Sequence, residues 1–251
     1  MLTTHRKKQI LSLLKQNGQV IAKAVSQSMG VSEDTIRRDL RELAQEGLLQ
    51  RVHGGALPAS PAIADFAGRE LLAPEGKVAI GRAAAAMIQP GQVVILDGGT
   101  TARQLARHMP LELKATIVTH SPTIALELVN HPDVDVILIG GRLFKHSVVA
   151  VGAAAIEAIA QLRADIYFMG VTGVHPRTGL TTGDFEEAAV KRALSHAAAE
   201  TIVLASSEKL NAASPYSVVP LDEISGIITE RTVDAALTEP YERLNITITR
   251  A

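Results

Sequence analysis

The sequence predicts an α/β fold in which a small N-terminal winged helix-turn-helix precedes a larger Rossmann-like domain with a mostly parallel sheet. First, residues 5–47 contain amphipathic helical segments that end at glycines, and a short predicted strand of apolar and basic residues follows them. Second, from residue 75 onward continuously apolar runs alternate with helical stretches, as expected for parallel strands buried on both faces. Third, a segment with several prolines separates the two patterns. We therefore expect a head over 1–57, a linker with limited helix over 58–74 and a second domain over 75–251.

The head has the order of elements that a winged helix-turn-helix requires. Helices are predicted over 5–16, 21–29 and 33–46, followed by a wing strand over 48–52 that turns at or near Gly54-Gly55. Ser32 is placed to cap the third helix, because its hydroxyl can accept a hydrogen bond from a backbone N–H in the first turn.

The larger domain is predicted from its alternation of strands and helices, which implies right-handed crossovers in a parallel sheet. The predicted strands are 93–96, 116–119, 134–139, 166–171, 202–205, 227–229 and 246–249. The predicted helices are 76–88, 100–108, 122–129, 153–162 and 185–198.

Charge divides the chain in the same way. Residues 1–56 hold nine Lys/Arg and five Asp/Glu, a charge of +4. The remaining residues hold 16 Lys/Arg and 21 Asp/Glu, a charge of −5, so the whole chain has a net charge of −1. A basic head on an acidic body favours a head that meets a polyanion. The absence of cysteine, of a secretory signal and of an apolar run near the roughly 20 residues of a membrane span predicts a cytoplasmic protein without membrane contact.

The third helix is predicted to read DNA. Ile36, Leu40 and Leu43 form its apolar face, so the arginines project outward, where they can donate to guanine or clamp phosphate. The alternative is a solvated helix face held by local ion pairs, but the turn, the cap, the arginine cluster and the Gly-Gly ribbon occur together and favour double-stranded DNA. The candidate DNA contacts are Ser32, Glu33, Thr35, Arg37, Arg38, Arg41, Arg51 and His53.

A ligand site is predicted where the first long strand ends in Asp97-Gly98-Gly99-Thr100-Thr101. Open α/β sheets bind ligands at this edge, glycines admit an anion close to the backbone, and a helix N-terminus presents free N–H groups. A tight strand-helix turn with a threonine cap would give the same residues. Similar loops at later strand ends favour an anion site, with Thr119, Ser121, Gly141 and Arg142 as further candidate contacts, Arg142 to a phosphate.

These motifs resemble the DeoR family of bacterial transcription regulators over the whole chain. The resemblance rests on the Thr35-Ile-Arg-Arg-Asp-Leu core and the Arg51-Val-His-Gly-Gly-Ala end, together with downstream motifs around Lys77, 96–101, 119–121, 140–142 and 187–192. It implies a repressor of a sugar or polyol catabolic operon that a phosphorylated sugar relieves. It also implies a sensor domain similar to ribose-5-phosphate isomerase, with Lys209 as a ligand contact. The family's usual aspartate, glycine and asparagine are here Ser206, Asn211 and His120, which leaves the identity of the sugar open.

Catalysis and metal binding are not expected. Where the similar isomerases carry an acidic loop, this chain reads Gly170-Val-Thr-Gly173-Val. Glu187 remains as a lone carboxylate suited to accept sugar hydroxyls or to cap its helix. The eight histidines form no pair with metal-binding spacing, so no metal and no cofactor is expected. The alternative function is a sugar-phosphate-binding or isomerase-like protein without an operator. Because one small head gives limited DNA specificity, a homo-oligomer, dimer or tetramer, is expected.

Overall fold

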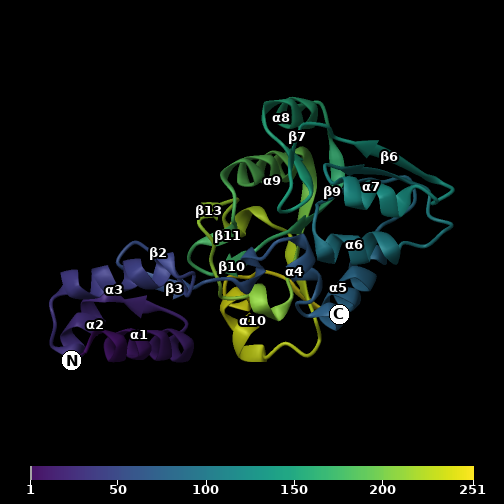
Figure 1. Ribbon diagram of the computed structural model, residues 1–251. Helices are drawn as coiled ribbons and strands as arrows, with labels where there is room; N and C mark the ends of the chain where they lie inside the picture. Colours follow the sequence, from purple (N-terminus) through teal and green to yellow (C-terminus); the bar gives the residue numbers. More distant parts are fainter. Residues whose placement is uncertain (1) are drawn as a thin grey trace.

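The computed structural model describes residues 2–251 and places the N-terminal elements in a lobe beside a larger α/β body (Figure 1). The head comprises helices α1 (Thr3–Asn17), α2 (Ala22–Met29) and α3 (Glu33–Gln45) and a sheet of order β1-β3-β2. Strands β2 (Leu49–Val52) and β3 (Gly55–Pro58) form the antiparallel wing, and the two-residue strand β1 (Val20–Ile21) pairs with β3. The predicted winged helix-turn-helix is confirmed; β1 is too short for periodicity to reveal.

The head folds around the apolar stripe of α3. Ile36, Leu40 and Leu43 are buried and pack with Ile10 of α1 and other apolar side chains of the head. Ser32 Oγ accepts a hydrogen bond from the Thr35 N–H at 3.2 Å, which caps α3 as expected.

The body is built on a seven-stranded parallel sheet of order β15-β14-β12-β9-β4-β5-β6. Its strands are β4 (Val93–Leu96), β5 (Ala115–Thr119), β6 (Val134–Leu138), β9 (Ala164–Gly170), β12 (Ala198–Leu204), β14 (Gly226–Thr229) and β15 (Ile248–Arg250). After β4 the chain adds β5 and β6 on one side and later β9 and β12 on the other. The strand order therefore reverses between β4 and β9, the position at which open α/β sheets bind ligands.

Helices cover both faces of this sheet, which explains why its strands are apolar throughout. Strand residues such as Val94 and Phe168 pack with α5 (Pro74–Ala85), α6 (Thr100–Arg107) and α7 (Pro122–Leu128). Strand residues of the opposite face, such as Tyr167 and Val203, pack with α8 (Ala153–Ala160), α9 (Phe185–Ala197) and α10 (Ala235–Glu242). The predicted Rossmann-like class is confirmed.

Small antiparallel elements, none of them predicted, surround the carboxyl edge of the sheet. They are the hairpin of β7 (Arg142–Phe144) and β8 (Val149–Val151), and the sheet of β10 (Gly173–His175), β11 (Gly179–Thr182) and β13 (Tyr216–Ser217). The 3₁₀ turns η2 (Ser207–Lys209) and η3 (Leu221–Glu223) follow β12 and β13.

The segment expected as a linker, 58–74, lies against the body. It forms the 3₁₀ turn η1 (Pro61–Ile63) and the short helix α4 (Phe66–Glu70), in keeping with limited helix. The Phe66 N–H donates to the His146 carbonyl at 3.0 Å, and the buried Ser60 hydroxyl donates to the Thr172 carbonyl. The two domains are thus joined by an anchored segment, and the exact domain boundaries stay a prediction. No helix among residues 2–251 is long and apolar enough to cross a membrane.

Candidate functional site

The outward face of α3 carries the arginines predicted to meet DNA. Asp34, Arg37, Arg38 and Arg41 are exposed at helical spacing, opposite the buried stripe. Arg37 donates to Glu33 at 2.8 Å, so the local ion pair considered as the alternative exists for this arginine. Arg38 and Arg41 are free of side-chain hydrogen bonds and ion pairs to any described residue, and their guanidinium groups are available to a polyanion.

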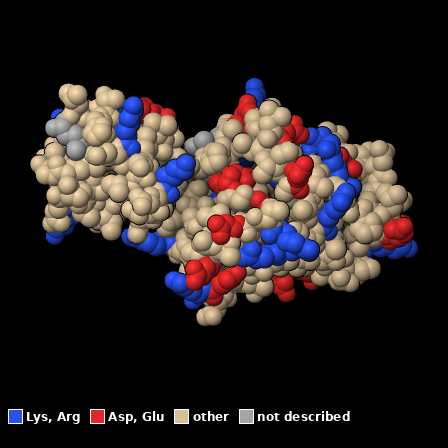
Figure 2. Space-filling view, turned by 90° about the horizontal axis from the view of Figure 1, so that it is seen from below, with Lys and Arg blue, Asp and Glu red and all other residues tan. Residues whose placement is uncertain are grey.

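The wing adds to the same surface. Arg51 of β2 and the following His53 are exposed, and Arg51 lines a small hollow with Arg37 and with Ala22, the first residue of α2. On the face shown in Figure 2, blue side chains predominate over red on the smaller lobe, whereas the larger lobe mixes both signs. The structure therefore gathers the predicted DNA contacts on α3 and the wing. Asp39 of α3 is buried, which does not fit the alternative of a wholly solvated polar face.

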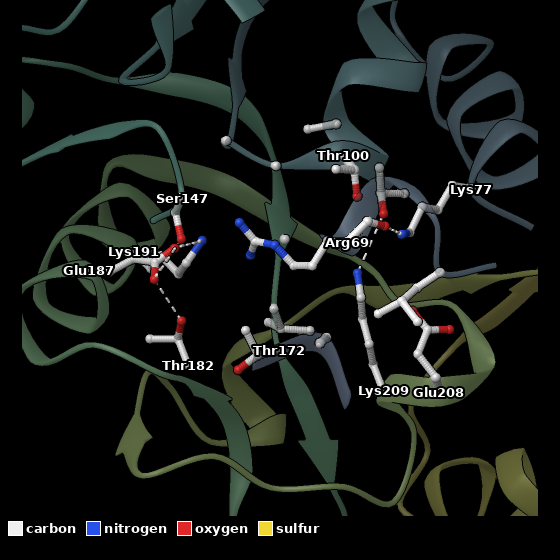
Figure 3. Close-up of a pocket in the computed structure, with 18 residues that line it drawn as sticks. Arg69, Lys77, Thr100, Ser147, Thr172, Thr182, Glu187, Lys191, Glu208 and Lys209 are labelled. Atoms are coloured by element: carbon white, nitrogen blue, oxygen red, sulfur yellow. Dashed lines mark hydrogen bonds and ion pairs between the residues drawn. The ribbon is translucent and has the colours of Figure 1, made fainter. Parts of the chain in front are cut away.

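A pocket opens at the carboxyl edge of the sheet, between the ends of β4 and β9 (Figure 3). Gly98 to Ala102 line it after β4, and Gly170 to Thr172 line it after β9. Side chains from α4, α5, α9 and η2 complete it, among them Arg69, Lys77, Glu187, Lys191, Glu208 and Lys209. This pocket thus lies at the topological switch point of the sheet.

The start of α6 forms the wall predicted to hold an anion. Thr100 and Thr101 are buried at the first helical positions, where backbone N–H groups lack intrahelical acceptors. Gly99 has φ 106°, a conformation that favours glycine, and a Cβ on Gly98 would lie 2.1 Å from a methyl carbon of Val149. Both glycines are required by the turn, which leaves the helix end open to the pocket.

Lys209, Lys77 and Arg69 lie in the pocket without a carboxylate partner at ion-pair distance among the described residues. Lys209 Nζ lies 3.4 Å from Thr101 Oγ1, and burial lowers the pKa of Lys209 to about 8. Burial also lowers the pKa of Lys77 and of Arg69, and Lys77 Nζ donates to the Arg69 carbonyl. Buried cations that lack counter-charges create a site for an anion.

Asp97 is held beneath the pocket. It is fully buried and accepts from Lys191 Nζ at 2.5 Å, from the Gly170 N–H at 2.7 Å and from His120 Nε2 at 2.8 Å. Burial would raise the pKa of Asp97, but the Lys191 charge and the His120 hydrogen bond hold it well below its ordinary value. Asp97 therefore does not line the pocket; it organises the residues that do.

His120 replaces the family's usual asparagine in this network. Its Nδ1 lies 2.9 Å from the Ala150 carbonyl oxygen and its Nε2 faces the Asp97 carboxylate, so both ring nitrogens meet acceptors.

The opposite wall of the pocket is suited to hydroxyl groups. Glu187 is buried, accepts from Thr182 Oγ1 at 3.0 Å and lies 3.5 Å from Lys191 Nζ. Ser147 Oγ is 3.5 Å from the same carboxylate. A carboxylate oriented in this way can accept hydrogen bonds from a polyol.

Besides Asp97, four further predicted ligand contacts lie outside the lining of the pocket. Thr119 and Ser121 are fully buried, and Ser121 Oγ donates to the Val148 carbonyl at 3.1 Å. Gly141 lies against β8, and the exposed Arg142 pairs with Glu186 on α9. Spacing alone does not distinguish one strand-end loop from another. Residues after β4, β9 and β12 reach the cavity, whereas Arg142 pairs with Glu186, so the structure does not bring Arg142 to a phosphate there.

The pocket also contains residues that the spacing argument did not select. Lys77 and Lys191 lie within the family-like motifs, a signal that could have found them. Arg69 lies in the segment read as a linker, and no motif marks it. Its position in the pocket depends on how α4 packs, which no local pattern encodes.

Comparison with protein families matches both parts of the chain. Residues 6–61 match the DeoR-like helix-turn-helix domain, and residues 73–231 match the DeoR C-terminal sensor domain. The chain belongs to the DeoR family. This DeoR-family chain is a DNA-binding transcription regulator, and the predicted resemblance is confirmed.

Curated relatives of this DeoR-family chain are regulators of similar length. The HTH-type transcriptional regulator GlpR of Haloferax volcanii is 35% identical over 250 residues, 99% of this chain and 98% of its own. The transcriptional repressor GlcR of Bacillus subtilis is 33% identical over 236 residues, 93% of this chain and 91% of its own. The glycerol-3-phosphate regulon repressor of Escherichia coli is 34% identical over 195 residues, 77% of each chain.

Solved structures resemble the DeoR-family chain more distantly. Ribose 5-phosphate isomerase A of Methanocaldococcus jannaschii covers 53% of this chain and 52% of its own, with 18% identity and a TM-score of 0.40. The sorbitol operon regulator SorC of Klebsiella pneumoniae covers 81% and 89%, with 14% identity and a TM-score of 0.38. Similarity at this level assigns no function.

Proposed function

We propose that this regulator is an operator-binding repressor of a sugar or polyol catabolic operon, and that a phosphorylated sugar or polyol binds the pocket and relieves repression. The observation that supports a phosphorylated ligand is the composition of the pocket. Its cations Lys77 and Lys209 lie beside a helix N-terminus, and Arg69 reaches across the cavity from them. Glu187 at the other end lies beside the hydroxyl groups of Thr182 and Ser147. A phosphate at the first wall and carbohydrate hydroxyls at the second complement these charges.

The names of the relatives support a role as a repressor. The glycerol-3-phosphate regulon repressor and GlcR are both named as repressors, and they match 77% and 93% of this chain. We extend repression to this chain on that basis.

The decisive experiment is binding of the purified protein to a labelled fragment of its own upstream intergenic DNA. The complex is titrated with glycerol 3-phosphate and with a panel of triose, pentose and hexose phosphates. Specific binding that one compound abolishes supports the proposal and identifies the effector. Absence of specific binding at every salt concentration rejects it.

Two substitutions separate the two activities. Arg38→Ala removes an unpaired guanidinium from the recognition helix, so we expect operator affinity to fall by about 1–3 kcal/mol while effector binding persists. Thr100→Trp fills the anion wall, so we expect normal operator binding that no phosphate ester relieves. Equal loss of both activities in both variants would indicate global destabilisation instead.

The alternative is a sugar-phosphate-binding protein whose basic head serves a protein partner. Salt distinguishes the two, because a DNA-binding protein that neutralises phosphates loses affinity linearly in log salt with a slope of about −0.9 per phosphate contact. An isomerase is disfavoured because the Lys191 and His120 interactions of Asp97 leave it unsuited to act as a base. Isomerisation of a pentose or hexose phosphate by the pure protein would overturn this inference.

We also propose that the functional form is a homo-oligomer held by the sensor domains. Strand β6 is an edge strand that pairs only with β5 among the described strands, and it exposes Ile137 and Leu138. The adjoining α7 region exposes Leu126 and Val129. Asp135 is the one charged residue of β6, and its other exposed side chains are apolar. Natural sheet edges are usually protected by several charges or covered, so this largely apolar edge favours a second copy of the chain.

A further inference from the structure

Arg69 lies in the middle of the effector pocket, although it belongs to the segment between the two domains. In Figure 3 its guanidinium points across the cavity toward Ser147, Lys191 and Glu187, with Lys77 and Lys209 on the other side. It also lines the adjoining cavity beside Phe144 and His146. The side chain therefore stands between the anion wall and the hydroxyl-binding wall.

The Arg69 side chain is half-buried, and the part of its guanidinium that is buried is unpaired. Its Nε and Nη2 make no hydrogen bond to any described residue. Its neighbours include the cations Lys77, Lys191 and Lys209. The carboxylates of Glu187 and Asp97 also act on it, but both lie at ion-pair distance from Lys191 and not from Arg69. Burying an unpaired charge is costly, so the position of Arg69 in the ligand-free pocket opposes docking of its own segment. An anionic ligand removes that cost.

The segment that carries Arg69 roofs the pocket. Ala62 and Leu72 line the cavity beside Arg69, and Ser60 and Phe66 are bonded to Thr172 and His146. Glu70 of α4 pairs with Arg103 at 2.6 Å. These contacts fix the segment to the body from its first turn to its helix.

The same segment continues directly into the DNA-binding head. Strand β3 ends at Pro58, whose carbonyl accepts from the Ala213 N–H at 3.1 Å, and Ala59 bridges to Ala213. Beyond this junction, Arg177 of the body donates to the half-buried Gln19 of the head at 2.7 Å. Docking of residues 59–72 therefore determines how the wing is held relative to the sensor domain.

We propose that Arg69 couples the effector to the DNA-binding head, by pairing with the bound anion and thereby holding residues 59–72 docked on the sensor domain. The operator-bound form has this segment released, with Arg69 outside the pocket. The ligand then binds the docked form more tightly than the released form, as any such coupling requires. This inference rests on the proposed function and adds to it the residue that transmits the signal.

The test separates ligand binding from operator release. Operator affinity of Arg69→Ala is measured without ligand and at ligand concentrations that saturate the variant, using the tightest-binding compound of the phosphate-ester panel. Inorganic phosphate serves as a probe of the anion wall alone. We expect ligand affinity to fall about 10- to 100-fold, because one charge-assisted contact is lost while Lys77 and Lys209 remain. We expect the operator affinity of the saturated variant to equal that of the free variant.

Arg82→Ala is the matched control. Arg82 is exposed on α5 and makes no side-chain contact to the described residues of the pocket. The Arg82→Ala substitution removes an arginine of the same domain, and both ligand binding and operator release should stay as in the wild type. Arg69→Lys keeps the positive charge but loses the planar guanidinium that can bind a phosphate with two N–H groups. It should therefore show part of the operator release that Arg69→Ala lacks.

Hydrogen–deuterium exchange provides a second readout that does not depend on the folding of a variant. In the wild-type protein, ligand should slow exchange of the amides of residues 61–72, and in Arg69→Lys this protection should be smaller. Unchanged exchange of that segment in ligand-saturated wild-type protein would overturn the inference.

The possible failures are distinguishable. If the saturated Arg69→Ala variant releases the operator as fully as the wild type, Arg69 is at most a ligand contact and the coupling role is rejected, while the proposed function stands. If the wild type binds operator but no phosphate ester, the proposed effector fails and this inference fails with it.

Discussion

At the residue scale, Lys209 links the pocket to pH. Burial lowers its pKa to about 8, so in the ligand-free protein its ammonium group is charged below that pH and neutral above it. A phosphate monoester gains its second charge near pH 6. The two titrations together define the window in which a charged lysine meets a dianion.

We therefore expect affinity for a sugar phosphate to be highest between about pH 6 and 8 and to fall as pH rises through the pKa of Lys209, by at most about tenfold per unit. Isothermal titration across pH 5 to 10 measures it. Lys209→Arg stays charged throughout and should lose the alkaline fall while keeping the acidic one. A wild-type profile that is flat between pH 8 and 10 would remove Lys209 from the site.

Asn211 illustrates how a departure from the family pattern is accommodated at one residue. It replaces a glycine and has φ 56°, a left-handed conformation that asparagine tolerates better than most residues. Its side chain accepts from the Tyr241 hydroxyl at 3.0 Å and its backbone N–H donates to that hydroxyl at 2.9 Å. The substitution thus leaves the loop after Lys209 in place.

At the scale of elements, the head is held by one ion pair inside its helix packing. Arg6 of α1 donates to Asp39 of α3 at 2.9 Å, and both side chains are buried. We expect Arg6→Ala to destabilise the head by about 3 kcal/mol, since it leaves a carboxylate unpaired. Circular dichroism and operator binding should report the loss, while sugar-phosphate binding by the sensor domain persists.

Lys7→Ala is the control for this pair. Lys7 bonds to Glu42 and Glu46 on the surface, at 3.1 and 3.0 Å, and exposed pairs contribute about 0–1 kcal/mol. A destabilisation by Lys7→Ala as large as that by Arg6→Ala would show that burial of the Arg6–Asp39 pair is not what matters.

Most of the helices and strands could be predicted from the sequence. The main helices and the parallel strands follow from periodicity, because each buries a long apolar stripe or a continuously apolar run. The glycine loop after β4 follows from its spacing. Arg69 and the antiparallel elements around the pocket do not, because segments of a few residues owe their structure to packing on the sheet and carry no period of their own. The part of the site that the sequence missed is the part contributed by those segments.

At the scale of the whole molecule, the two edges of the main sheet differ. Strand β15 has three residues and ends in Arg250, whereas β6 has five residues and exposes Ile137 and Leu138. Charge and short length protect an edge from pairing, so β6 is the edge expected to pair with a second copy.

Leu138→Lys should therefore shift the oligomer toward monomer in analytical ultracentrifugation and weaken operator binding, because one head contacts one half-site. Effector binding should persist, since the pocket is built within one chain. The exposed Leu244, after α10, offers a control, and Leu244→Lys should leave the oligomer intact. An unchanged sedimentation profile for Leu138→Lys would place the interface elsewhere.

Coupling through the whole molecule must be reciprocal. If the effector lowers operator affinity by some factor, saturating operator DNA must lower effector affinity by the same factor, typically about 5- to 150-fold. Titrating the effector into the protein with and without a saturating operator duplex measures this factor directly, and a scrambled duplex controls for charge alone. In Arg69→Ala the two effector affinities should coincide, because the segment that joins pocket and wing no longer responds to the anion. Equal effector affinity with and without operator in the wild type, alongside ligand-induced release, would violate linkage and point to competition by the ligand for the DNA-binding surface itself.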